Sequence, residues 1–448
     1  MTERTTTRWV LSVRHRWQEM RASFWFLPAV IVLGAVGMAT AVIGVDATVE
    51  LKFVERWPLL FGAGAAGSRG LLTAVASSMI TVAGVVFSIT IVALSLTSSQ
   101  YTSRVLRNFM RDRVNQTVLG VFVGIFAYCL VVLRTIRGGD EGAFVPSLAV
   151  LLGLLLAFVG IAFLIYFIHH IAISIQASSI IAAAAFETLS AIDHLFPKGL
   201  GTEAGDPLAN REPVDEKYDW LAIPARKTGY IEGVDGDALL ALASERNTVF
   251  RMERGIGEFV IEGTPLVVIA SSTQLHDDEI DALNAVYVVG RQRTVEQDAG
   301  FGIRQIVDIS LKALSPGVND TTTAMMCLDY LTAILVRLAA REIPSSHRFK
   351  DGKLLVIARG PTFESMLAEA FDQIRQNAEG NVAVLTRLVE ALETIVEATL
   401  DTRRRQGLRT QAELVAAVAE RTVTPAEAAG INVAFVRLNH IFNFLGAT

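Results

Sequence analysis

Long apolar runs without charge fill the N-terminal part of the chain and alternate with short polar segments. They cover about 24–45, 71–96, 114–133 and 146–168. Each is long enough to cross a bilayer as an α-helix, which takes about 20 apolar residues. The first run is longer than the apolar core of a signal peptide, so we interpret it as an uncleaved anchor. The pattern predicts four transmembrane helices.

A different pattern follows the segment 197–219, which is rich in glycine, proline and acidic residues and is the expected linker. Short β-type runs punctuated by glycine and proline indicate a small β module at 220–275. Beyond it, apolar residues recur at helical spacing, which predicts a mainly helical region at 276–448. We therefore expect a membrane domain at 1–196 and a separate α+β domain after the linker.

Composition agrees with a membrane-bound chain. Of the 448 residues, 52% are hydrophobic, and the mean hydropathy of +0.43 is high for a soluble protein. The formal net charge of −5 gives no basic field, so we do not expect nucleic acid as a partner. The two cysteines, Cys129 and Cys327, offer neither a disulfide framework nor a thiolate metal site.

Arginine residues are distributed unequally between the polar segments. The segment 1–23 has five arginines and the loop 97–113 has four, whereas basic residues in the loops 46–70 and 134–145 are balanced by acidic ones. Positively charged loops stay in the cytoplasm. We expect both termini and the loop 97–113 to be cytoplasmic in a bacterial inner membrane. An anion or lipid head-group site at Arg104–Arg113 is the alternative interpretation.

Hydroxyl side chains follow one face of the second apolar run, and most of them recur every seven residues. They are Ser77, Thr81, Ser88, Ser95 and Thr102. Heptad spacing keeps such residues on one side of a helix. Two interpretations stay open: small and hydroxyl residues allow close packing of membrane helices, or they line a hydrated ion path in a homo-oligomer.

A second candidate site, for a small ligand or ion, lies in the C-terminal part. Its residues are Asp298, Arg304, Asp308, Asn319 and Asp320. We expect a helix at 294–314, opened by a capping box from Thr294 to Gln297. On this helix Arg304 and Asp308 are four residues apart and can pair. Asp320 can cap the next helix or, with Asn319, bind a cation.

Catalytic chemistry is not indicated anywhere in the sequence. No nucleophile stands with a base and an orienting group, and no metal-ligand spacing surrounds the candidate residues. We therefore expect no enzyme, no cofactor and no metal site. His169 and His170, at the end of the fourth run, are explained by interfacial placement or by pH sensing.

Two segments carry a resemblance to a known family: FSITIVALSLTSSQYTSRVLRNF and GIRQIVDISLKALSPGVNDTTTA. Together with the four apolar runs, they resemble a family of predicted bacterial inner-membrane proteins of unknown function. This resemblance covers nearly the whole chain. It implies a membrane location and a cytoplasmic C-terminal domain, and it supplies no activity.

A local resemblance concerns the segment GEFVIEGTPLVVI at 257–269. It is similar to the strand–turn–strand of biotinyl/lipoyl-like barrel-sandwich modules. The resemblance implies that fold only, because the lysine that carries the prosthetic group in those modules is missing here.

The expected fold is an α-helical membrane protein with four transmembrane helices and a cytoplasmic α+β domain. Its expected partners are the lipid bilayer, further copies of the chain, and a small ion or ligand. Two functions fit. The first is an oligomeric channel-like or transport protein, with a pore lined by the second span and a cytoplasmic regulatory domain. The alternative is a non-conducting scaffold or sensor whose cytoplasmic domain binds a partner or ligand.

Overall fold

The computed structural model describes residues 25–48, 64–100, 112–138, 144–196, 219–271 and 275–446. The chain divides into two compact units, Met1–Ser179 and Ile180–Thr448. This division lies before the linker expected at 197–219, because helix α8 (Ala177–Leu195) packs on elements of the second unit. The residues 197–218 of that linker lie outside the described part of the chain.

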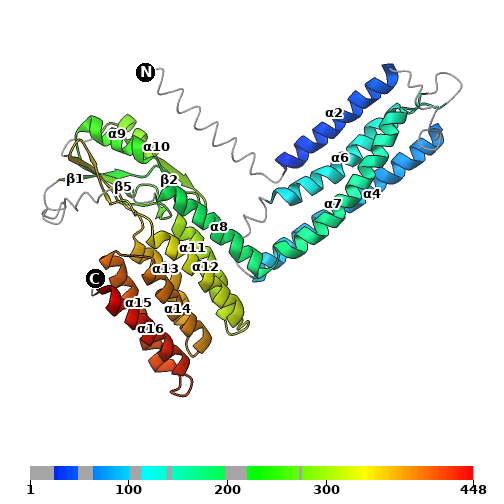
Figure 1. The fold of residues 1–448 in the computed structure, drawn as a ribbon. Coiled ribbons are helices and arrows are strands. Elements are labelled where there is room, and N and C mark those ends of the chain that lie inside the picture. Colours follow the sequence, from blue (N-terminus) through cyan, green and yellow to red (C-terminus); the bar gives the residue numbers. More distant parts are fainter. Residues whose placement is uncertain are drawn as a thin grey trace. The chain divides into compact units, whose positions relative to one another are not determined.

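Long helices build the first unit (Figure 1). They are α2 (Phe26–Thr48), α4 (Ala65–Gln100), α6 (Arg113–Thr135) and α7 (Ser147–Ser174), and they overlap the four expected spans. Helix α6 packs against the other three. A Cβ at Gly120 of α6 would meet the side chain of Ile31, and one at Gly153 of α7 would meet Leu72. Small residues at such crossings let membrane helices approach closely.

Polar contacts fix the helix ends of the first unit. The Asp46 carboxylate accepts hydrogen bonds from the backbone N–H groups of Leu148 (3.2 Å) and Ala149 (3.0 Å). At another helix end, Asp112 accepts from the N–H of Val114 at 2.8 Å. The second carboxylate oxygen of Asp112 lies 2.6 Å from Nε2 of His170.

Five helices among the described residues are long and apolar enough to cross a membrane, one more than expected. The additional one is α12 (Thr321–Ala339), in the second unit. Its apolar face is buried in that unit. Asp329 on this helix pairs with Arg387 at 2.6 Å and Arg337 pairs with Asp193 at 2.7 Å. A helix with one core-facing side and few charges therefore meets the same length and hydropathy criteria as a membrane span.

Two small sheets lie in the second unit. Their strands are β1 (Trp220–Pro224), β2 (Gly229–Val234), β3 (Phe250–Met252), β4 (Phe259–Val260), β5 (Pro265–Ala270), β6 (Tyr287–Gly290), β7 (His347–Lys350) and β8 (Lys353–Ile357). One sheet has the order β1-β5-β3-β8-β7 and the other β4-β2-β6. All pairs are antiparallel except β3–β8, which is parallel.

The expected barrel-sandwich is wrong, because the described strands close no barrel. Strand β6 comes from beyond residue 275 and pairs with β2, and β8 comes from still further along the chain and pairs with β3. These long-range pairings extend both sheets with strands that the local motif does not contain. They also join the 220–275 segment to the mainly helical part.

The remaining helices of the second unit are α9 (Gly236–Arg246), α10 (Asp277–Ala285), α11 (Ala299–Leu314), α13 (Phe363–Asn377), α14 (Val382–Glu397), α15 (Thr402–Thr422) and α16 (Ala429–Gly446). Helices α11, α12, α14 and α16 pack in succession, and α13 and α15 pack against them (Figure 1). Side chains accept from first-turn N–H groups at Asp298, Asp320, Thr362, Asn381 and Asp401. Such caps fix where these helices begin.

Helix α8 is held on the second unit by charge and by close approach. Asp193 accepts from Nε and Nη2 of Arg337 at 2.8 and 2.7 Å and also pairs with Arg341. The hydrogen bonds from Arg337 hold the pKa of the Asp193 carboxyl well below its usual range. A Cβ at Gly302 of α11 would fall into the side chain of Thr188 on α8.

Candidate functional site

A cavity of about 830 Å³ opens in the second unit, in the range of typical small-molecule sites. Its wall includes the carboxyl ends of β2, β3 and β8 and the first turns of α9, α11 and α13. The pair β3–β8 is parallel, so both strands end on the same side of their sheet. Crevices at the carboxyl ends of parallel strands are common ligand sites.

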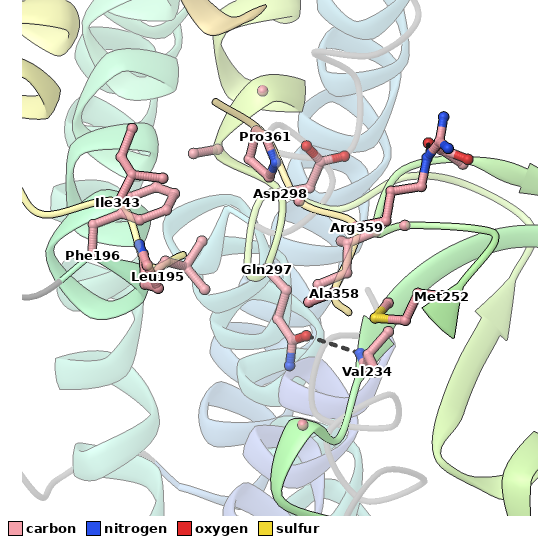
Figure 2. Close-up of a pocket in the computed structure, with 18 of the residues that line it drawn as sticks. Leu195, Phe196, Val234, Met252, Gln297, Asp298, Ile343, Ala358, Arg359 and Pro361 are labelled. Atoms are coloured by element: carbon pink, nitrogen blue, oxygen red, sulfur yellow. Dashed lines mark hydrogen bonds and ion pairs between the residues drawn. The ribbon is translucent and has the colours of Figure 1, made fainter. Parts of the chain in front are cut away.

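Apolar side chains form the inner part of this cavity. Six of them are less than a tenth exposed: Phe196, Leu239, Met252, Ala299, Val356 and Met366. Leu195 and Phe196, at and just after the end of α8, belong to the same lining. Figure 2 shows these two residues beside Ile343, with Gln297 toward the middle of the view and Met252 beyond it. The inner part of the cavity is therefore suited to the apolar portion of a ligand.

Guanidinium groups supply the cations of the cavity lining. Arg359 Nε lies 2.6 Å from Glu258; the Arg359 side chain is 56% exposed, whereas Glu258 is half-buried. Arg293 Nε lies 2.8 Å from Asp298 in a more buried pair. Arg348, on β7, is exposed and has no ion-pair partner within the described residues. Arg348 and Arg359 are thus the cations most easily engaged by a ligand.

Asp298 is held in place from several sides. One carboxylate oxygen meets Arg293, and the other accepts from the N–H of Phe301 at 3.0 Å, which makes Asp298 the N-cap of α11. Gly257 approaches this pair with a φ of +83°, and a side chain there would run into Asp298 and Arg293. Both the positive φ and the close approach require glycine.

The expected start of this helix is wrong. The sequence predicts a helix at 294–314 with a capping box from Thr294 to Gln297, but α11 begins at Ala299. The Gln297 side chain instead accepts from the backbone N–H of Val234 at 3.1 Å (Figure 2). A tertiary hydrogen bond to the end of β2 thus replaces the local cap.

The five residues of the expected C-terminal site do not come together. Asp298 and Asp320 cap successive helices and stand at opposite ends of the 16-residue α11, about 24 Å apart along its axis. Arg304 pairs with Asp308 at 2.9 Å and reaches Glu369, on the cavity wall, at 3.3 Å. In the part of the chain that the structure describes, no group of three or more His, Cys, Asp or Glu could hold a metal ion.

Asp320 is occupied by its own helix. It accepts from the backbone N–H of Thr323 at 3.0 Å and from its hydroxyl at 2.6 Å. These hydrogen bonds lower the pKa of the Asp320 carboxyl. Asn319 beside it has a positive φ of 49°, as expected for a turn before a helix. Their geometry is that of a helix cap.

Sequence reasoning missed most of the cavity. Glu258, Arg348 and Arg359 are isolated charges in three different segments, and nothing in their spacing joins them. One local signal exists in the sequence, because Arg359 follows a short apolar run at 354–358 and precedes Gly360 and Pro361. A break of this kind after a strand is a usual place for site residues.

The hydroxyl stripe of α4 lies on an exposed face of that helix. Ser77, Thr81, Ser88 and Ser95 are exposed, whereas Thr102 lies outside the described residues. The buried face is a separate series: Leu72, Ala76, Met79, Ala83, Val86, Thr90, Ala93 and Thr97. Each described stripe residue follows a member of this series by five positions, about 140° around the helix. Within one chain, the stripe therefore takes no part in helix packing.

Most of the arginine cluster at 104–113 lies outside the described residues, and only Arg113, the first residue of α6, is placed. The alternatives for that cluster therefore remain predictions from the sequence.

Comparison with known proteins gives a family match over most of the chain. The family described as "Predicted membrane protein (DUF2254)" matches residues 21–394. The uncharacterized protein Rv1290c of Mycobacterium tuberculosis is 34% identical over 410 residues, which cover 90% of this chain and 77% of that protein. The uncharacterized protein Mb1321c of Mycobacterium bovis gives the same values. No solved structure matches. The chain therefore belongs to the DUF2254 family of predicted membrane proteins.

Proposed function

We propose that the protein is a homo-oligomeric, channel-like protein of the bacterial inner membrane. Copies of the chain meet along the exposed hydroxyl face of α4, and Ser77, Thr81, Ser88 and Ser95 line a path for small ions. The observation that carries this proposal is the separation of the stripe from the packed face of α4. Hydroxyls that a single chain does not use for packing are available to replace water around an ion.

The proposed arrangement in the membrane has four spans, α2, α4, α6 and α7. Helix α12 remains in the cytoplasmic domain, because its charged side chains pair with α8 and α14. Both termini and the loop 97–113 face the cytoplasm, on account of their arginines. The second unit then acts as a regulatory domain.

Substitution at Ser88 tests the path. Ser88→Ala keeps the side chain small and removes its hydroxyl, whereas Ser88→Leu also adds bulk. The control is Ile89→Phe, which adds bulk at an exposed apolar position about 100° around the same helix from Ser88. The purified protein is placed in liposomes, fluxes of K⁺, Na⁺ and Cl⁻ are measured, and the oligomer is sized by chemical cross-linking.

A path predicts that Ser88→Leu leaves the oligomer intact and lowers flux strongly, while Ile89→Phe changes neither. An oligomer that dissociates in Ser88→Leu and is unchanged in Ser88→Ala indicates a packing role for the stripe instead. Wild-type liposomes with no flux above protein-free ones would also exclude conduction.

The second candidate function is a non-conducting ligand sensor, and the cavity favours it. Leu195 and Phe196 contribute to the cavity wall at the end of α8. Helix α8 is separated from α7 only by Ile175 and Gln176. Ligand binding at the cavity is therefore connected to a membrane helix through the length of α8, about 29 Å. Absence of flux combined with ligand binding would support this second function.

A further inference from the structure

We propose that the cavity of the second unit binds a small molecule of the nucleotide class, with a flat aromatic body and a phosphate group. As a regulatory site it rests on the role proposed above for the second unit, but binding itself does not depend on conduction. The proposal stands on three features of the cavity: its apolar interior, its available guanidinium groups and its backbone donors.

The interior is suited to an aromatic ring. Met252 and Met366 are both nearly buried and line the cavity together with Leu239 and Val356. Thioether side chains are polarizable and make favourable contacts with aromatic rings. Phe196 adds an aromatic surface of its own. A purely inorganic anion would leave this apolar surface uncovered.

The guanidinium groups of the lining are suited to a phosphate. Arg348 has no ion-pair partner among the described residues, and Arg359, itself 56% exposed, pairs with the half-buried Glu258. Glu258 also lies 3.8 Å from Arg254, so a ligand that engages Arg359 leaves this carboxylate a second partner. A guanidinium presents a planar fork of donors that matches phosphate oxygens.

The carboxylates of the lining do not oppose an anion strongly. Asp298 is paired with Arg293, and Glu258 with Arg359. Glu369 is paired with Arg304. The remaining carboxylate, Asp237, is exposed in the first turn of α9, where solvent screens it.

Backbone donors add to the attraction. The first turns of α9, α11 and α13 border the cavity, and their N–H groups carry partial positive charge. Gly236 and Gly360 also line the cavity, with nothing within 4 Å of a Cβ built at either position. Phosphate oxygens can therefore approach the main chain at these positions.

Binding is tested on the full-length protein in detergent, by equilibrium dialysis and by the shift in thermal unfolding. The probes are ADP and GDP. Adenosine, which has the aromatic base but no phosphate, and pyrophosphate, which has phosphate groups but no base, are the partial ligands. The variants are Arg348→Gln and Arg359→Gln. The matched control is Arg421→Gln, an exposed arginine of α15 that pairs with Glu379 and does not line the cavity.

We expect a nucleoside diphosphate to bind and to raise the unfolding temperature, with weaker binding of adenosine and pyrophosphate. Each cavity arginine variant weakens binding by about tenfold, the loss expected for one hydrogen bond to a charged group, and the control does not. Ala358→Leu, which fills the cavity without changing charge, also weakens it.

Several results would overturn the assignment. Equal binding of pyrophosphate and nucleotide would exclude a role for the apolar wall, and equal binding of adenosine would exclude the guanidinium role. No binding of any probe would exclude the nucleotide class. Because ion flux is measured separately, failure of this site and failure of the proposed conduction are distinguished.

Discussion

Single residues decide how α8 is attached to the second unit. Asp193 is the acceptor for Arg337 and also pairs with Arg341, which is 7% exposed. The pKa of this carboxyl is lowered, chiefly by the hydrogen bond from Arg337. A lowered carboxyl pKa means that the ionised form stabilises the folded state.

The pH dependence of Asp193→Asn follows from the direction of that shift. The unfolded-state pKa of an aspartate is about 3.9. Because the folded-state pKa is lower, the contribution is fully present above the unfolded value and is lost as the pH falls through the folded value. We expect Asp193→Asn to lower the unfolding temperature at pH 7, and the difference from wild type to shrink progressively below about pH 4. A difference that does not change down to pH 2 would contradict this.

Gly302 is the second residue on which this attachment depends. Replacement by valine places side-chain atoms where Thr188 lies. We expect a loss of about 1–3 kcal/mol in folding free energy, because overpacked contacts force neighbouring groups to shift. Gly317→Ala, where a Cβ meets nothing within 4 Å, is the control. Thermal unfolding in detergent measures both, and equal midpoints for the two variants would show that α8 does not cross α11 closely.

At the scale of elements, the sequence predicts well wherever a local rule applies. A span must be apolar over about 20 residues, so α2, α4, α6 and α7 were predictable. The cap of α12 at Asp320 was predictable because aspartate is a preferred residue just before a helix. The pairing of β3 with β8 was not, because its strands lie about a hundred positions apart and neither strand specifies its partner.

The cavity was the feature that the sequence predicted least well. It depends on Arg348, Arg359 and Glu258, which the fold brings together from separate loops and strands. Asp298 was a candidate from the sequence and does line the cavity, but Asn319 and Asp320 do not. Local spacing placed all five candidates on or near one helix. Because α11 is 16 residues long, Asp298 at its start and Asp320 beyond its end are too far apart to form one site.

For the whole molecule, the orientation in the membrane is the next testable property. Cys129 and Cys327 are buried, so single reporter cysteines can be added over a low background. A membrane-impermeant maleimide applied to intact cells should label Gly138→Cys, between α6 and α7, and should not label Lys227→Cys in the second unit. After cell lysis both should react. Labelling of Lys227→Cys alone in intact cells would reverse the proposed orientation.

Water access to the α4 stripe tests the proposed ion path most directly. The Ser88→Cys variant is reconstituted in liposomes and treated with a charged methanethiosulfonate reagent, with Ile89→Cys as the comparison position, exposed and about 100° around the same helix. A hydrated path predicts that the reagent modifies Ser88→Cys and lowers ion flux, while Ile89→Cys, away from the stripe, stays unmodified. A Ser88→Cys variant as unreactive as Ile89→Cys would contradict a water-filled path along α4.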